Sequence, residues 1–115
     1  MRLHSSIWVA AYIRQVANTG ATAMLVRRGE STAGAIYIKV SKLDGTAQLF
    51  SPAPLFDQVQ GRDRAWYSEF KDEMPSERDV DEYLAGQARS DSDIWVIEVE
   101  DRAGRHFLDD QLTDL

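Results

Sequence analysis

Apolar residues recur at helical spacing near the start of the chain. Ser5 or Ser6 can cap a helix there, and Gly20 follows as a stop signal. One face of this segment collects apolar residues at 3.6-residue spacing, namely Val9, Ile13, Val16 and Ala17. Trp8 and Tyr12 lie on the adjoining face. Because this apolar stripe is wide, we expect more than one neighbouring element to cover the helix.

A second helical pattern begins at Pro75 and Ser76 and runs to about Arg89. Ser76 is followed three residues later by Asp79, a spacing similar to that of a capping box. The inward face is a narrow stripe made of Val80, Tyr83, Leu84, Gln87 and Ala88. We therefore expect a surface helix that buries only one side.

Apolar and polar residues alternate with a period of two elsewhere in the chain. This pattern predicts strands over residues 22–28, 34–42, 46–51 and 92–100. In the second of these strands, we expect the face that carries Lys39 to be exposed to solvent. Between the second and third strands, Asp44-Gly45 predicts a hairpin with a type I′ turn.

Two further strands are short. Residues 65–70 predict a fourth strand, with a short helix as the alternative, and residues 105–108 are expected to pair back after a turn that ends at Gly104. The element order is typical of an α+β domain, here a single domain over residues 1–115. We predict a mainly antiparallel sheet of about five strands, with its first three strands in a meander and two helices packed on one face.

Three blocks of the sequence resemble a known family. They are SSIWVAAYIR near the start, AGAIYIKVSKLDGTAQLFSPAP in the middle and DIWVIEVEDRAGRHFL near the end. Together they resemble a small bacterial family of unknown function, domain-of-unknown-function family 1491, over nearly the whole chain. The resemblance implies a stand-alone, cytoplasmic bacterial protein. It assigns no activity to any residue, because the family has none that could be carried over.

The charge of the chain is uneven. Residues 1–56 contain six basic and two acidic residues, a balance of +4, whereas residues 57–115 contain seven basic and seventeen acidic residues, a balance of −10. The net charge is −6 and the pI is near 4.8. This acidity argues against binding to duplex nucleic acid and against docking on an anionic membrane surface.

The chain contains no cysteine. A disulfide framework, a thiolate metal site and a cysteine nucleophile are thereby excluded. The apolar stretch near the N-terminus ends at Arg14 and is too short and too polar for a signal peptide or a membrane span. We therefore expect a cytoplasmic protein, and we predict neither a metal nor a cofactor.

A small-ligand site or a minor enzyme is one hypothesis for the function. Arg27 and Arg28 adjoin the polar loop 29–34, which could hold an anion, and His106 lies near carboxylates that could work with it as base or ligand. A pocket between the first helix and the sheet would hold all three residues. However, the loop joins two strands rather than opening a helix, and His106 matches no established ligand spacing. A hairpin loop and a half-exposed strand histidine are the simpler interpretations.

Carboxylates gather on one face of the strand predicted over residues 92–100. Glu98 and Glu100 are two positions apart and point the same way. Such a pair could serve in general acid–base catalysis. Like charges on a strand are also common where a basic strand runs beside them, and Lys39 is the obvious partner. We prefer the pairing with Lys39.

Basic and aromatic side chains interleave in one segment, at Arg62, Arg64, Trp66 and Tyr67. Surfaces that bind single-stranded nucleic acid have this composition. Acidic residues in the same segment neutralise it, so we expect Trp66 to pack inward and the arginines to pair with nearby acids. Trp8 and Trp95 are expected in an aromatic core cluster, although tryptophan also marks interfaces.

The missing catalytic signature and the uneven charge together favour a non-catalytic protein-interaction or binding module. Its acidic surface would lie mainly on the second helix and on the acidic tail, and it would meet a basic partner protein. The residues proposed for this surface are Glu77, Asp79, Asp81 and Glu82. A second copy of the chain, forming a homodimer, is the other candidate partner.

Overall fold

The computed structural model describes residues 2–54, 64–71 and 73–114 of the chain. Its helices are α1 (Ser5–Asn18), α2 (Glu77–Ser90) and the short 3-10 helix η2 (Asp109–Gln111). Its strands are β1 (Thr22–Arg27), β2 (Ile36–Ser41), β3 (Ala47–Pro52), β4 (Trp66–Ser68) and β5 (Trp95–Glu100). The radius of gyration is 13.2 Å. Among the described residues, no helix is long and apolar enough to cross a membrane.

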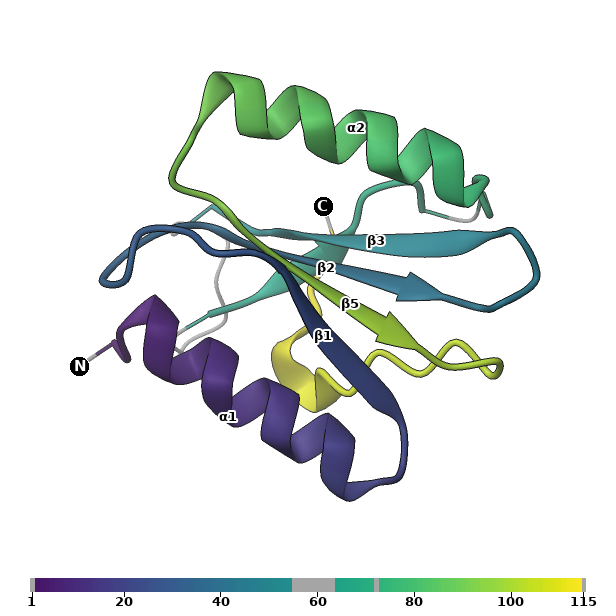
Figure 1. Ribbon diagram of the computed structural model, residues 1–115, viewed down its shortest axis with the longest axis horizontal. Coiled ribbons are helices and arrows are strands. Elements are labelled where there is room, and N and C mark those ends of the chain that lie inside the picture. The colour runs from purple at the N-terminus through teal and green to yellow at the C-terminus, as the bar shows by residue number, and fades with distance from the viewer. Residues whose placement is uncertain (1, 55–63, 72, 115) are drawn as a thin grey trace.

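The strands form one sheet in the order β1-β5-β2-β3-β4 (Figure 1). β5 runs parallel to β2, and the other neighbouring pairs are antiparallel. The α+β class and the mainly antiparallel sheet are thus confirmed. The predicted meander of the first three strands is wrong, because β5 lies between β1 and β2. β5 buries Trp95, Ile97 and Val99 on one face and Val96 on the other. A strand that is buried on both faces is stabilised most in the middle of a sheet that is covered on both sides.

The two long helices lie on opposite faces of the sheet (Figure 1). α1 packs its aromatic and aliphatic side chains against one face. α2 packs Val80 and Leu84 against the other face. The prediction that both helices cover one face is therefore wrong. It failed because Tyr37 and Lys39, which we expected to face water, lie beneath α2.

Two of the predicted helix signals are confirmed. The hydroxyl of Ser76 caps α2 by accepting a hydrogen bond from the backbone N–H of Asp79 at 3.1 Å. Gly20 follows the end of α1 with a φ of +90°, a conformation that glycine adopts without strain.

The start of α1 is held by the loop 29–34 rather than by a serine cap. The N-cap residue is His4, and its side chain makes no capping hydrogen bond. The backbone N–H groups of Ser5 and Ser6 donate to carbonyls of the loop at 3.1 and 3.0 Å. The Ser5 hydroxyl donates to the carbonyl of Gly34 at 2.8 Å. The prediction that Ser5 or Ser6 caps the helix is therefore wrong. The helix begins one residue earlier, with the N–H groups of Ile7 and Trp8 donating to the carbonyl of His4, and the Ser5 hydroxyl is engaged with Gly34.

The hairpin between β2 and β3 is confirmed, but its turn is not the predicted type I′. Such a turn needs a positive φ at both Asp44 and Gly45. The positive values instead occur at Leu43 (62°) and Gly45 (91°). The Asp44 carboxylate accepts the backbone N–H of Thr46 at 2.9 Å. This local bond stabilises a longer turn than the two-residue one.

The strand predicted over residues 65–70 is confirmed as the short β4, which pairs with β3. The strand predicted over residues 105–108 is wrong. The carboxylate of Asp101 accepts the backbone N–H of Arg105 at 2.7 Å, and Phe107 has a φ of 58°. The chain therefore turns away from β5 instead of pairing with it.

Candidate functional site

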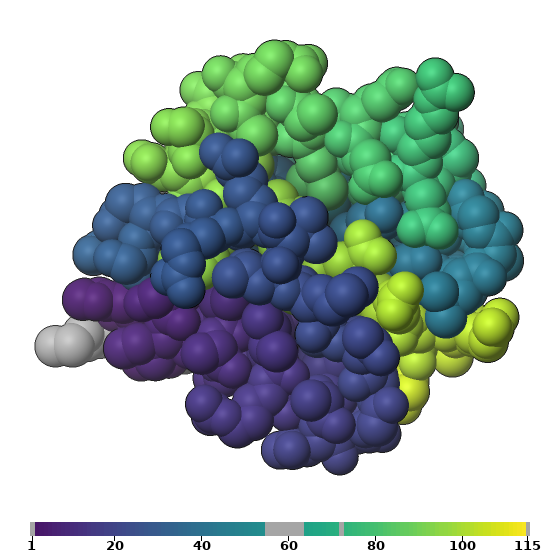
Figure 2. Space-filling model, viewed as in Figure 1, coloured from purple at the N-terminus to yellow at the C-terminus, as the bar shows by residue number. Residues whose placement is uncertain are grey.

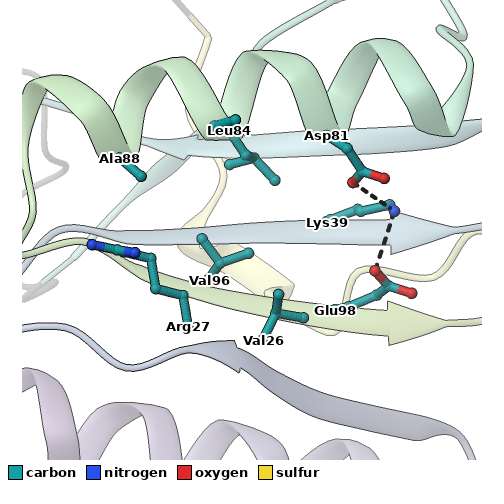
Figure 3. Close-up of a pocket in the computed structure, with 9 residues that line it drawn as sticks. Val26, Arg27, Lys39, Asp81, Leu84, Ala88, Val96 and Glu98 are labelled. Carbon is teal, nitrogen blue, oxygen red and sulfur yellow. Dashed lines mark hydrogen bonds and ion pairs between the residues drawn. The ribbon is translucent and has the colours of Figure 1, made fainter.

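A groove runs between α2 and the part of the sheet that contains β1 and β5 (Figure 3). Its volume is about 470 Å³. Figure 3 shows apolar side chains along its middle, Arg27 at one end, and Lys39 between two carboxylates at the other. We call it the α2 groove, and its lining residues are Val26, Arg27, Lys39, Asp81, Leu84, Ala85, Ala88, Val96 and Glu98.

One end of the α2 groove is built around a buried lysine. Lys39 is 4% exposed. Its Nζ atom lies 2.9 Å from Asp81 and 3.1 Å from both Glu77 and Glu98. The parallel register places Glu98 beside Lys39, and i,i+4 spacing places Glu77 and Asp81 on one side of α2. We call these four residues the Lys39 cluster. The pairing expected between Lys39 and the carboxylates of the last strand is confirmed for Glu98.

Lys39 keeps its positive charge at neutral pH. Burial would lower the pKa of Lys39, but hydrogen bonds to Asp81, Glu77 and Glu98 outweigh burial and hold this pKa well above its usual value. A lysine nucleophile needs a lowered pKa, so Lys39 is not poised for covalent chemistry. One ammonium among three carboxylates leaves an excess of negative charge. Part of this charge faces solvent, because the Asp81 side chain is 61% exposed.

Arg27 forms the opposite end of the α2 groove. Its Nη2 atom donates to the carbonyl of Ser92 at 3.0 Å. Its Nε atom is buried and has no hydrogen-bond partner in the part of the chain that the structure describes. Between the two ends, Leu84 and Val96 are buried and Val26 is 58% exposed. The α2 groove therefore combines an apolar floor with opposite charges at its ends.

The three residues suggested for a small-ligand pocket are not brought together. Arg27 lies on the α2 side of the sheet. Arg28 places its guanidinium 5.5 Å from the ring centroid of Trp95. His106 lies on the α1 side, where its ring packs edge-on against Phe50. The sheet therefore separates Arg27 from His106.

The imidazole of His106 is used within the fold. Its Nδ1 atom accepts the backbone N–H of Leu108 at 3.0 Å. Burial lowers the pKa of His106, and the nearby Asp109 carboxylate acts in the opposite direction. Within the described residues, no three side chains of the types His, Cys, Asp and Glu are placed to hold a metal ion.

The loop 29–34, which we considered as an anion site, already binds a carboxylate from its own sequence, that of Glu30. The Glu30 carboxylate accepts the backbone N–H groups of Thr32 and Ala33, both at 2.8 Å. These hydrogen bonds lower the pKa of Glu30. A Cβ atom on Gly29 would lie 2.2 Å from the carbonyl oxygen of Asp93, so glycine lets the loop approach the start of β5. The N–H groups that could hold a phosphate already hold Glu30.

The four acidic residues proposed as a partner surface divide into two pairs. Glu77 and Asp81 belong to the Lys39 cluster. Asp79 and Glu82 are exposed on α2, where Glu82 accepts from Nε of Arg78 at 3.3 Å. Of the four, Asp81 lines the groove, and Glu77 is connected to the groove through Lys39.

Sequence reasoning missed the apolar floor of the groove and the burial of Lys39 at one end of it. The available signal was a lysine set between Ile38 and Val40 in an otherwise apolar strand. A charged residue in such a strand is seldom buried unless it is paired. Its partners on α2 lie about forty residues away in the chain.

The segment with interleaved basic and aromatic residues does not present an aromatic surface at Trp66. Trp66 is 1% exposed, and its Nε1 atom donates to the carbonyl of Ile36 at 2.8 Å. Arg64 is buried and donates to the carbonyl of Leu3 at 2.8 Å. Arg62 lies outside the described residues. The prediction that Trp66 packs inward is confirmed.

The chain is similar to proteins of known structure over most of its length. One is a DUF1491 family protein from Caulobacter crescentus CB15, known from a crystal structure. Its sequence is 42% identical to this one, the alignment covers 98% of this chain and 99% of that chain, and the TM-score is 0.80. An NMR structure from the same organism is 42% identical, covers 98% of both chains and has a TM-score of 0.78. A solution structure of a protein from A. tumefaciens is 31% identical, covers 87% of this chain and 86% of that one, and has a TM-score of 0.71.

No functionally curated protein matches the chain. The family described as a protein of unknown function (DUF1491) matches residues 3–109. This match spans α1, α2 and the strands β1 to β5, and it agrees with the resemblance of the three sequence blocks. The chain therefore belongs to the DUF1491 family.

Proposed function

We propose that this protein is a non-catalytic interaction module that binds a basic segment of a partner protein in the α2 groove. The observation that carries the proposal is the Lys39 cluster, in which three carboxylates surround one buried ammonium at the end of an apolar groove. A lysine or arginine of the partner enters beside Asp81 and Glu98. Its apolar neighbours cover Leu84 and Val96.

The charge balance of the groove favours a cation over an anion at this end. Lys39 occupies one oxygen of each carboxylate, and the remaining oxygens can accept charge-assisted hydrogen bonds. Asp81 loses little hydration on binding, because its side chain is largely exposed in the free protein. At the other end, Arg27 favours an acidic side chain or a carboxyl terminus. The two ends together set the direction of the bound segment.

The length of the groove fits a short extended segment. Asp81 and Ala88 both line it, and seven helical residues span about 10.5 Å. An extended chain advances about 3.3 Å per residue, so about three residues of the partner fill the groove. So few residues make a small interface, and we expect a dissociation constant in the micromolar range.

Selection from a random peptide library displayed on phage tests this proposal. The enriched peptides should contain an arginine or lysine beside apolar residues and should lack acidic residues at that position. A synthetic peptide of the enriched sequence should shift the amide resonances of Val26, Asp81, Leu84 and Val96 in the NMR spectrum of the protein. Enrichment of acidic peptides, shifts elsewhere on the surface, or no enrichment at all would contradict the proposal.

A matched pair of variants separates the groove from the general acidity of α2. Asp81→Asn and Asp79→Asn each remove one negative charge from the same helix, but only Asp81 lines the groove. We expect Asp81→Asn to weaken binding of the selected peptide about tenfold, which corresponds to about 1.4 kcal/mol. Asp79→Asn should change the affinity less than twofold. Equal losses in the two variants would mean that binding depends on overall charge rather than on the groove.

A further inference from the structure

β1 is an edge strand whose outer side is apolar and uncovered. β5 pairs with one side of β1, and no strand of the described chain pairs with the other. Met24, Leu25 and Val26 follow one another on β1 and are 42%, 40% and 58% exposed. Figure 2 shows β1 and the loop that follows it at the front of the molecule, between α1 and α2.

Native proteins generally protect such an edge with proline, inward-pointing charges, a bulge or a covering element. Residues 22–26 contain neither proline nor a charged residue. The register of β1 against β5 shifts between Leu25 and Arg27, and this bulge leaves Thr22 to Leu25 as a regular stretch. The exposed backbone there is free to pair with another strand.

We propose that β1 pairs antiparallel with β1 of a second copy, which forms a symmetric homodimer with one sheet continuous across both copies. One end of β1 carries a basic residue and the other lies beside an acidic residue of β5, and this argues for a second copy as the occupant. β1 ends at Arg27, and Arg28 follows it. Neither arginine forms an ion pair within the described residues. At its start, Thr22 lies beside Glu100 of β5.

Antiparallel pairing over the full length of β1 brings these opposite ends together. It places Arg27 of each copy opposite Thr22 of the other, with Glu100 one strand further. Two strand spacings are about 9.6 Å. An arginine and a glutamate side chain span this distance between them once Arg27 exchanges its hydrogen bond to the carbonyl of Ser92 for the contact with Glu100. Arg27 lies opposite Val96, and Glu100 is two positions beyond Glu98, so both side chains emerge on the α2 face.

The space around Glu100 accommodates the incoming arginine. A hollow of about 490 Å³ lies beside Thr22 and Glu100. Arg102 and Arg105 also line it, and Arg105 is paired with Asp101. Parallel pairing of the two β1 strands would instead place arginine beside arginine, which is destabilising. The two-fold symmetry of the antiparallel arrangement forms the Arg27–Glu100 contact twice.

This inference does not rest on the proposed function. The Lys39 cluster is formed by β2, β5 and α2, so the acidic end of the α2 groove stays open in the dimer. The two copies would carry their grooves on the same face of the shared sheet. Arg27 belongs both to the α2 groove and to the proposed dimer contact. Met24→Lys changes a residue outside the groove lining, so this variant tests the dimer separately from binding in the groove.

Sedimentation velocity of the full chain over a concentration series tests the dimer. We expect a dimer that dissociates on dilution, because β1 is only six residues long, and that weakens as salt screens the two ion pairs. Arg27→Glu should raise the dissociation constant at least tenfold, and so should Met24→Lys, which places a charge on the edge. The double variant Arg27→Glu with Glu100→Arg restores the charge pair and should recover most of the affinity.

Arg14→Glu makes the same change of charge on an exposed position of α1 and should leave the dissociation constant within twofold of the unmodified protein. Circular dichroism of each variant shows whether the fold is kept. A protein that stays monomeric at every concentration would overturn the inference, and so would a dimer that neither Met24→Lys nor Arg27→Glu weakens. A charge-swapped double variant that dimerises no better than Arg27→Glu would overturn the proposed register.

Discussion

The two faces of the sheet are built from different chemistry. The α1 face is filled by large rings and branched aliphatic side chains, and the ring centroids of Trp8 and Trp66 lie 4.5 Å apart. The α2 face has a smaller apolar cluster, and beside it lie the buried ammonium of Lys39 and an open groove. The first face is closed by packing, whereas the second leaves charge and space available.

This difference indicates that the α1 face mainly stabilises the fold, whereas the α2 face is suited to binding. A buried ion cluster is an inefficient way to stabilise a fold, because desolvation of the charges offsets much of their attraction. Well-packed apolar side chains in place of Lys39, Glu98 and Asp81 could hold α2 as firmly. The cluster is therefore easier to understand as part of a site than as part of the core. Substitutions made on one face at a time test this difference.

The largest effect is expected from Trp66→Ala on the α1 face. The substitution empties a fully buried ring site and leaves the carbonyl of Ile36 without its hydrogen-bond donor. We expect a loss of about 3–5 kcal/mol in the free energy of unfolding, measured by urea denaturation. Trp66→Phe keeps most of the ring and should cost less than half as much. Equal losses in both variants would mean that the hydrogen bond, rather than the packing, holds this site.

Lys39→Met on the α2 face should have the next largest effect. It leaves Glu77, Asp81 and Glu98 beside an uncharged side chain, and breaking a buried ion pair in this way costs about 3 kcal/mol. The same denaturation experiment measures the loss. Lys42→Met removes an equal charge from the adjacent hairpin loop and should cost less than about 0.5 kcal/mol.

A further variant identifies the origin of the Lys39→Met penalty. If the penalty arises from carboxylates left without a cation, adding Asp81→Asn and Glu98→Gln should restore part of the lost stability. A triple variant that is less stable than Lys39→Met alone would show that these carboxylates hold α2 through other contacts.

The contribution of Lys39 should also depend on pH in a defined direction. Hydrogen bonds to the carboxylates outweigh burial and hold the pKa of Lys39 above its unfolded value, which is about 10.4. The stabilisation is therefore fully present below about pH 10 and is lost as the pH rises through the folded-state pKa. The difference in unfolding free energy between the unmodified protein and Lys39→Met should be constant from neutral pH to about pH 9 and should shrink above about pH 10.4. A difference that shrinks already near pH 8 would contradict the raised pKa.

Features decided within a few residues could be predicted from the sequence. Ser76 and Gly20 act as the helix signals that they resemble, and the β2–β3 hairpin forms around Gly45. The order of the sheet could not be predicted in the same way. Whether β5 enters between β1 and β2 depends on contacts such as Lys39↔Glu98, between residues far apart in the chain. Nothing in the local alternation of β2 specifies that neighbour.

The candidate site could not be predicted for the same reason, because it also depends on contacts between residues far apart in the chain. Alternation alone assigns Lys39 to a solvent-facing side, because charged residues usually lie there. Its burial follows only once α2 is placed over that side and supplies Glu77 and Asp81. The acidic residues of α2 were recognised from the sequence, but their division between a groove and an open surface was not. That division depends on the direction in which α2 crosses the sheet.

The smallest predicted effect concerns His106, whose ring lies on the α1 face. Burial lowers the pKa of His106, against a smaller opposing effect of Asp109. Its folded-state pKa thus lies below the unfolded value of about 6.5. Its contribution to stability is then present above about pH 6.5 and is lost as the pH falls through the folded-state pKa, because the unfolded chain binds the proton first. The difference in unfolding free energy between the unmodified protein and His106→Gln should narrow as the pH falls from 7.5 to 5. A difference that stays constant over this pH range would contradict the lowered pKa of His106, and the burial of its ring against Phe50 would then carry no penalty for the charged form.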